Sequence, residues 1–192
     1  NLGAGGCTQA EQTAAIMIGY EKVINEKKPD LCLVVGDVTS TMACAITAQK
    51  SNVKVAHVEA GIRSGDWTMP EEINRMVTDS ISNYFFTTTL IANNNLKKNG
   101  VEDDRIFWVG NTMIDTLLKQ RKNFIKPKIW DQIGLIEKNY IVMTLHRPAN
   151  VDKDEELKNL IFEIVKNCND LPIIFPVHPR TQKIIETIGI KH

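Results

Sequence analysis

Apolar residues along the chain form short continuous runs that alternate with stretches of helical periodicity. Strand-like runs cover residues 31–35, 53–60, 84–89, 106–110, 140–146 and 172–178. Helical patterns lie near residues 8–26, 41–50, 70–83, 90–98, 112–123, 153–168 and 180–188. Continuous apolar runs are typical of parallel strands buried on both faces. Their alternation with helices predicts βαβ units and a doubly wound α/β fold.

A domain boundary is predicted close to Gly110, where the spacing of the strands widens. Residues 1–111 then hold four strands and most of a first domain. Residues 112–192 hold two strands, too few to close a doubly wound sheet. The second domain is therefore predicted to be incomplete.

Composition narrows the class of protein. The 192 residues are 43% hydrophobic and 24% charged, with a formal net charge of zero, so no basic footprint indicates nucleic-acid binding. No apolar run is long enough to span a membrane, and no signal peptide of the usual form opens the chain. The four cysteines form no CxxC pair. We expect a cytoplasmic protein with no metal site and no cofactor.

Polar residues that follow the strands are the candidates for chemistry, because α/β sheets bind ligands beyond the carboxyl ends of their strands. Acids follow strands of the first half, at Asp37 and Glu59, and a Gly61–Asp66 loop comes next. Histidine and arginine follow strands of the second half, at His146, Arg147, His178 and Arg180. Acids and bases would line a cleft if the two halves face each other.

Each candidate also has a structural interpretation. Asp37 could instead be the N-cap of the next helix. Glu59 could form an ion pair with Arg63 or Arg75, since a carboxylate after a buried strand needs a partner.

The helix that opens with Pro70 offers a similar choice. Glu71 and Arg75 are four residues apart and are predicted to pair on one face. His57 is more often a satisfied core histidine than a catalyst.

Six short motifs occur in order along the chain: GDVTST, HVEAGIRS, MPEEINR, GNTMIDTL, LHRPAN and PVHPR. Together they resemble the bacterial non-hydrolysing UDP-N-acetylglucosamine 2-epimerases over essentially the whole chain. The resemblance implies two Rossmann-like domains facing a cleft in the glycosyltransferase-B arrangement, and a homodimer. The family's opening Gly-Thr-Arg-Pro turn and its later Gln-Glu-Glu segment are absent, so we expect an internal fragment that is inactive alone.

The resemblance also implies a chemistry and its residues. The family interconverts UDP-N-acetylglucosamine and UDP-N-acetylmannosamine for polysaccharide synthesis, by eliminating UDP and adding it back. Its catalytic positions fall on Asp37, Glu59, Glu71 and His146. Its substrate-binding positions fall on Arg75 and His178. Arg147, next to His146, is expected to bind phosphate as well, because arginine suits bidentate phosphate contact. We expect the three acids to form the acid–base group, in no assigned order.

Three alternatives stay open at this point. The hydrolysing relative, which releases N-acetylmannosamine and UDP, shares the early motifs. A glycosyltransferase on the same scaffold is disfavoured by the combination of HVEAG and PEEINR. A nucleotide-sugar sensor or inactive homologue is disfavoured because every carried-over acid and histidine is present.

Overall fold

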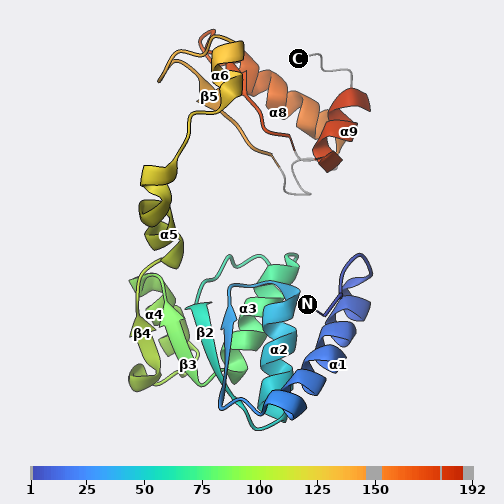
Figure 1. Ribbon diagram of the computed structural model, residues 1–192, viewed down its shortest axis with the longest axis vertical. Coiled ribbons are helices and arrows are strands. Elements are labelled where there is room, and N and C mark those ends of the chain that lie inside the picture. The colour runs from blue at the N-terminus through green and yellow to red at the C-terminus, as the bar shows by residue number, and fades with distance from the viewer. Residues whose placement is uncertain (1, 146–152, 178, 188–192) are drawn as a thin grey trace. The chain divides into compact units, whose positions relative to one another are not determined.

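The chain forms two compact units, which are described separately. The computed structural model describes residues 2–145, 153–177 and 179–187 (Figure 1). The first unit is Asn1–Asn123 and the second is Phe124–His192. The helix after Gly110 belongs with the first unit by its contacts, whereas the predicted domain boundary lies before that helix. That boundary stays a prediction.

The first unit alternates helices with strands as the apolar pattern predicts. Its elements are α1 (Gln9–Lys27), β1 (Leu31–Val35), α2 (Thr39–Lys50), β2 (Lys54–Ala60), α3 (Pro70–Ile81), β3 (Tyr84–Thr87), α4 (Leu90–Lys98), η1 (Asp103–Arg105), β4 (Ile106–Trp108), α5 (Thr112–Gln120) and η2 (Arg121–Asn123). The four strands pair in parallel in the order β1-β2-β3-β4. The predicted parallel α/β sheet is confirmed. The expectation that its strands are buried on both faces is wrong for β1, in which every second residue is exposed.

The second unit is smaller. Its described elements are α6 (Lys128–Gln132), β5 (Ile141–Val142), α8 (Asp154–Lys166), β6 (Ile173–Ile174) and α9 (Pro179–Thr187). β5 and β6 pair in parallel, but both are much shorter than the apolar runs that predicted them. Leu157 and Ile161 of α8 and Ile185 of α9 form a small buried core. The pattern did not predict the short helix α6.

Local sequence explains where the helices of the first unit begin and end. Thr8 and Glu11 form a capping box at the start of α1, in which each side chain bonds the other's backbone N–H. Lys28, directly after the last residue of α1, adopts the left-handed conformation, and Pro29 follows. Pro70 opens α3 at a position where its missing N–H costs nothing.

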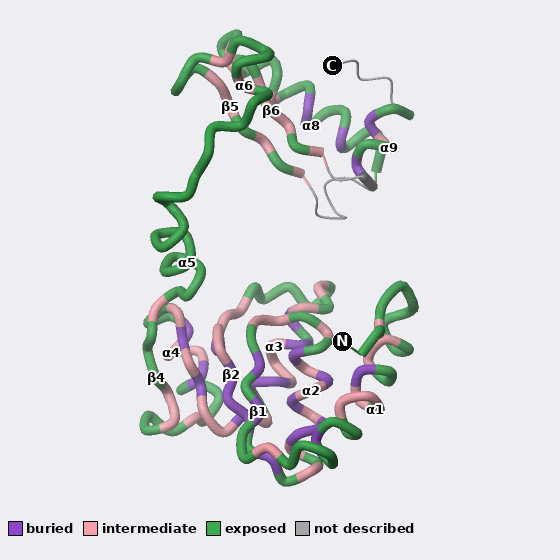
Figure 2. The backbone as a smooth tube through the Cα atoms, in the orientation of Figure 1, coloured by how far each residue is buried: buried purple, intermediate pink, exposed green. Residues whose placement is uncertain are grey.

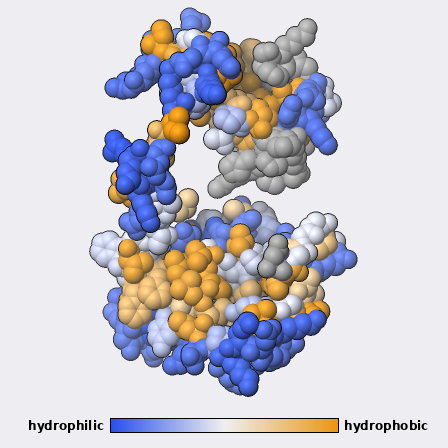
Figure 3. All heavy atoms as spheres, viewed as in Figure 1, coloured by the Kyte–Doolittle hydropathy of each residue, from blue (hydrophilic) through white to orange (hydrophobic). Residues whose placement is uncertain are grey.

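Helices α1 and α2 pack against β1 on one face of the sheet of the first unit. Cys32 and Val34 of β1 pack with Ile24 of α1 and with Ala45 and Ala48 of α2. On the other face of the sheet Leu31, Leu33 and Val35 are exposed, so burial alternates along β1 (Figure 2). Apolar side chains consequently gather over this side of the unit (Figure 3). Consecutive parallel strands joined by right-handed crossovers place their helices on one face, which explains the asymmetry.

Gly61, directly after β2, lies in a closely packed part of the first unit. Its φ is +77°, and a Cβ there would lie 2.4 Å from the carbonyl oxygen of Ala92. We expect Gly61→Ala to destabilise the full-length protein by roughly 2–5 kcal/mol, from backbone strain plus overpacking.

Gly65→Ala is the matched control, since Gly65 has a φ of +75° but nothing within 4 Å of its Cβ position. Urea unfolding should show a loss of only about 1 kcal/mol for the control. Equal losses in the two variants would contradict close packing at Gly61.

Candidate active site

Asp37 lies at the carboxyl end of β1 and does not cap α2. α2 begins at Thr39, its N-cap residue is Val38, and no side chain bonds the cap. The Asp37 carboxylate instead accepts hydrogen bonds from Arg75 Nε at 3.0 Å and Nη2 at 2.5 Å. Asn74 Nδ2 donates to the Asp37 carbonyl oxygen at 2.8 Å. The N-cap interpretation of Asp37 is therefore wrong, and α3 holds this residue from 38 positions away.

Arg75 joins two acids, but Glu71 is not one of them. Its Nη1 donates to Glu72 Oε2 at 2.8 Å, while its other donors bind Asp37. The predicted Glu71–Arg75 pair is wrong, because the i,i+3 partner Glu72 is the buried neighbour. Burial opposes the charge on Arg75, yet the hydrogen bonds and negative charges of Glu72 and Asp37 outweigh it and raise the pKa of Arg75.

Glu72, which sequence reasoning overlooked, ties α3 to the loop after β2. Its side chain is 3% exposed, and it accepts hydrogen bonds from Ser64 N–H and Gly65 N–H, each at 3.0 Å. Burial alone would raise the pKa of Glu72. The bonds from Ser64, Arg75 and Gly65 outweigh burial and lower the pKa from 4.5 to about 2.

The lowered pKa of Glu72 gives stability a defined pH dependence. A carboxyl whose folded pKa lies below its unfolded value stabilises fully above about pH 4.5 and loses this contribution as pH falls toward about 2. Glu72→Gln is expected to unfold more easily at neutral pH by about 3 kcal/mol. The difference from wild type should shrink steadily as the pH is lowered, measured by urea unfolding of the full-length protein. The control is Glu21→Gln, because Glu21 is exposed. A stability difference between Glu72→Gln and wild type that stays constant with pH would contradict the lowered pKa of Glu72.

Glu59 stands in a strained position at the end of β2. Its φ is +70°, and the β2–β3 register shifts between Val58 and Ala60 around it. Such a conformation in a residue other than glycine is costly and concentrates at functional sites. The Glu59 carboxylate lies against Gly36, with Oε2 3.6 Å from the point where a Cβ of Gly36 would be. Glu59 and Asp37 therefore belong to one cluster at adjacent strand ends.

The expected ion pairs of Glu59 are not formed. Arg63 Nη1 contacts Asp79 Oδ2 at 2.6 Å, and Arg75 contacts Asp37 and Glu72. Within the described part of the chain, no hydrogen bond or ion pair holds the Glu59 carboxylate. Glu59 therefore stays a candidate for proton transfer, because its half-buried carboxylate is not held in a structural contact.

His57 is a satisfied core histidine, as the sequence indicated. The side chain is fully buried, and both ring nitrogens have polar partners. Its partner Asp79, like Glu72, was missed at first. The spacing of Glu72, Arg75 and Asp79 at i, i+3 and i+7 places them on one helix face and could have revealed both acids.

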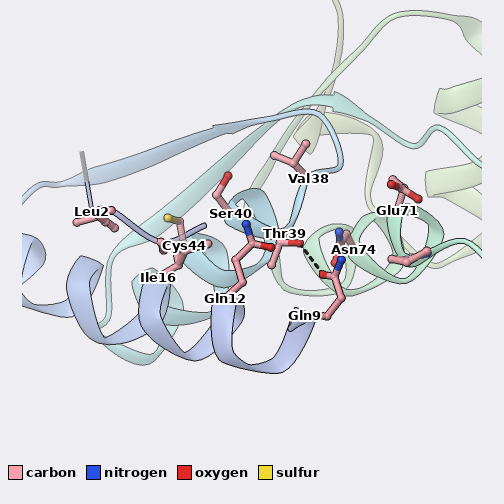
Figure 4. Close-up of a pocket in the computed structure, with 13 residues that line it drawn as sticks. Leu2, Gln9, Gln12, Ile16, Val38, Thr39, Ser40, Cys44, Glu71 and Asn74 are labelled. Carbon is pink, nitrogen blue, oxygen red and sulfur yellow. Dashed lines mark hydrogen bonds between the residues drawn. The ribbon is translucent and has the colours of Figure 1, made fainter. Parts of the chain in front are cut away.

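A cavity of about 460 Å³ lies beside this cluster, between the N-terminal segment, α1, α2 and α3 (Figure 4). Glu71 and Asn74 line it from α3, and Thr39 donates to Gln9 Oε1 at 3.1 Å across it. The lining does not include Asp37 or Glu59. The structure therefore brings Asp37, Glu59 and Arg75 together and places Glu71 at the edge of the adjoining cavity.

The candidate residues of the second unit are not placed by the structure. His146, Arg147 and His178 lie outside the described residues, and they stay predictions. Across the ranges that the structure describes, no three His, Cys, Asp or Glu side chains are grouped as metal ligands would be. None of the described helices is both long and apolar enough to cross a bilayer.

A parallel sheet with acids at the carboxyl ends of its strands defines the first unit as a Rossmann-like α/β domain. Comparison with known proteins identifies the family. The family model described as UDP-N-acetylglucosamine 2-epimerase matches residues 1–192. The chain belongs to the UDP-N-acetylglucosamine 2-epimerase family.

Individual relatives agree with the family match. The UDP-N-acetylglucosamine 2-epimerase of Methanocaldococcus jannaschii is 45% identical over 196 residues, which cover 99% of this chain and 53% of that protein. The UDP-2,3-diacetamido-2,3-dideoxy-D-glucuronate 2-epimerase of Pseudomonas aeruginosa is 38% identical over 190 residues, covering 97% and 52%. The chain thus spans about half the length of the curated relatives it matches.

A solved structure confirms the fold class. The crystal structure of the M. jannaschii UDP-GlcNAc 2-epimerase in complex with UDP-GlcNAc and UDP matches with a TM-score of 0.85 at 45% identity. The match covers 98% of this chain and 53% of that one. The predicted fold class, Rossmann-like α/β units of the glycosyltransferase-B type, is confirmed for the part that the chain covers.

Proposed function

We propose that the full-length protein interconverts UDP-N-acetylglucosamine and UDP-N-acetylmannosamine by inverting C2 of the sugar. The observation that carries the proposal is the cluster of Asp37 and Glu59 at adjacent strand ends, with Asp37 held by Arg75. It occurs in a chain of the UDP-N-acetylglucosamine 2-epimerase family. The M. jannaschii relative was crystallised with UDP-GlcNAc and UDP, which supports this class of ligand.

The chemistry explains why carboxylates are needed. The C2 proton is not adjacent to a carbonyl group, so its direct removal is difficult. If a base takes that proton while the C1–O bond to UDP breaks, the products are UDP and 2-acetamidoglucal. UDP then adds back to C1, and an acid delivers a proton to the opposite face of C2. The reaction therefore requires two proton-transferring groups, one on each face.

The residues of the first unit fit these roles. Asp37, Glu59 and Glu71 supply the acid–base group, without an assigned order. Arg75 holds Asp37 in place through its Nε and Nη2 donors, so its charge lies next to the proposed reacting carboxylate. His146 is proposed to complete the catalytic set, Arg147 to stabilise the departing pyrophosphate, and His178 to bind the nucleotide.

A product assay tests the proposal against its alternatives. The full-length protein is incubated with UDP-N-acetylglucosamine, and the products are separated by chromatography. Formation of UDP-N-acetylmannosamine supports the epimerase. Free N-acetylmannosamine with UDP would establish the hydrolysing reaction instead, and sugar transfer to an added acceptor would establish a glycosyltransferase. An unchanged substrate would leave binding alone as the function.

The same assay also addresses the identity of the sugar. The P. aeruginosa relative is named as a 2-epimerase of a diacetamido-glucuronate, which also carries UDP. Turnover of that sugar but not of UDP-N-acetylglucosamine would show that the protein is specific for a different UDP-sugar. The proposed inversion at C2 would still hold. A homodimer and a cytoplasmic location are further parts of the proposal.

A further inference from the structure

The buried ring of His57 links the turn after β1 to the side chain of Asp79 in α3. Nε2 lies 2.9 Å from the carbonyl oxygen of Gly36, and Nδ1 lies 2.7 Å from Asp79 Oδ1. A carbonyl oxygen can only accept a hydrogen bond, so Nε2 must carry a hydrogen. One ring nitrogen is thereby assigned as a donor to the end of β1.

Asp79 is the partner of the second ring nitrogen. Asp79 Oδ2 contacts Arg63 Nη1 at 2.6 Å and accepts from Gly61 N–H at 3.0 Å. Both oxygens of Asp79 are therefore engaged, Oδ2 by Arg63 and Gly61 and Oδ1 by Nδ1 of His57. His57, Asp79 and Arg63 form a continuous chain of contacts, in which His57 and Asp79 are buried.

Both turns held by this pair carry a predicted catalytic acid. Gly36, with a φ of +71°, directly precedes Asp37. Gly61 follows the strained Glu59 by two residues. His57 fixes the peptide group that enters Asp37, while Asp79 fixes the N–H that follows Glu59. The buried pair of His57 and Asp79 therefore fixes the backbone next to both carboxylates.

We propose that His57 and Asp79 are positioning residues, which hold Asp37 and Glu59 in register through the Gly36 carbonyl and the Gly61 N–H. This inference rests on the proposed function. Stability alone is a weak explanation, because well-packed apolar residues often replace buried ion pairs without loss. The two bonded backbone groups, in contrast, flank the acids that the reaction requires. A shift of about 1 Å in a reacting group lowers the rate by roughly 100-fold.

Two substitutions of His57 separate its contacts in the full-length protein. The amide nitrogen of His57→Gln reaches toward the position of Nε2 and keeps the bond to Gly36. The amide nitrogen of His57→Asn reaches toward the position of Nδ1 and keeps the bond to Asp79. We expect kcat for C2 inversion to fall roughly 10- to 100-fold in His57→Asn with KM little changed, and to stay within about threefold in His57→Gln.

Thr47→Val is the matched control. Thr47 is buried in α2, away from the cluster, and its hydroxyl donates to the Ala43 carbonyl oxygen at 2.8 Å. The control should lower Tm and leave kcat unchanged, which separates a loss of stability from a loss of positioning. Equal falls of kcat in both His57 variants, or a fall in neither, would overturn the proposal.

If the His57 variants do not fold, a measurement on the wild-type protein tests the contact between His57 and Gly36. Long-range proton–nitrogen NMR of the ring-labelled wild-type protein should show Nε2 of His57 in the N–H form, because it faces the Gly36 carbonyl oxygen. An Nε2 without a hydrogen would overturn the proposal. Failure of the proposed function would look different, because the wild-type protein would then show no inversion at C2 while the His57 ring remained as described.

Discussion

Asp37→Asn is expected to lower kcat by roughly 10²–10⁴-fold while the full-length protein stays folded. Asparagine has nearly the shape of aspartate and keeps an oxygen that can accept from Arg75, but it cannot take or give the C2 proton. The Asp37–Arg75 pair is partly exposed, so we expect a stability loss of only about 1 kcal/mol. Turnover of UDP-N-acetylglucosamine and thermal unfolding measure the two effects separately.

Asp30→Asn is the control for this substitution. Asp30 is an exposed acid just before β1, so the same chemical change is made at the opposite end of the same strand. Its kcat should equal that of the wild type. Normal turnover in Asp37→Asn would contradict a catalytic role for Asp37. If turnover were lost because the variant unfolds, Asp37 would have a structural role and not a role in proton transfer.

Glu59→Gln is expected to lower kcat by a similar roughly 10²–10⁴-fold with little change in stability. The Glu59 carboxylate has no hydrogen-bond or ion-pair partner among the residues that the structure describes, so neutralising it breaks no such contact there. Glu59→Gly should lose the same activity and gain up to about 1 kcal/mol, because glycine adopts a φ of +70° without strain. Steady-state kinetics and urea unfolding test both statements.

Lys28→Gly provides the control for relief of strain. Lys28 has a φ of +45° at the end of α1, away from the cluster. The substitution should stabilise the protein to a similar small extent with unchanged kcat. Retained turnover in Glu59→Gly would contradict the view that the strained backbone places a reacting carboxylate.

Local pattern predicted most of the first unit. The apolar run LCLVV predicted β1 with its observed bounds, and Pro70 with the two following acids predicted the start of α3. These features are encoded within a few residues, by apolar runs and by the chemistry of helix ends. The acids at the strand ends followed from the topology, because parallel strands deliver their carboxyl ends to one edge of the sheet.

The partners of the charged groups could not be predicted in the same way. From the sequence, Arg75 had one acid at i−4 and another at i−3, and nothing local favoured Glu72 over Glu71. Tertiary structure decided between them, because Glu72 faces the Ser64–Gly65 backbone and Asp37 arrives from β1. The positive φ of Glu59 likewise arises from the irregular pairing of β2 with β3, which no pattern of apolar residues records.

The most direct test of C2 inversion through proton removal is to incubate the full-length protein with UDP-N-acetylglucosamine in deuterated water and to follow C2 by proton NMR. We expect deuterium at C2 of intact UDP-sugar in both configurations, because the proton is taken by one protein group and replaced by another. UDP-sugar that retains its C2 proton throughout would contradict inversion by proton removal.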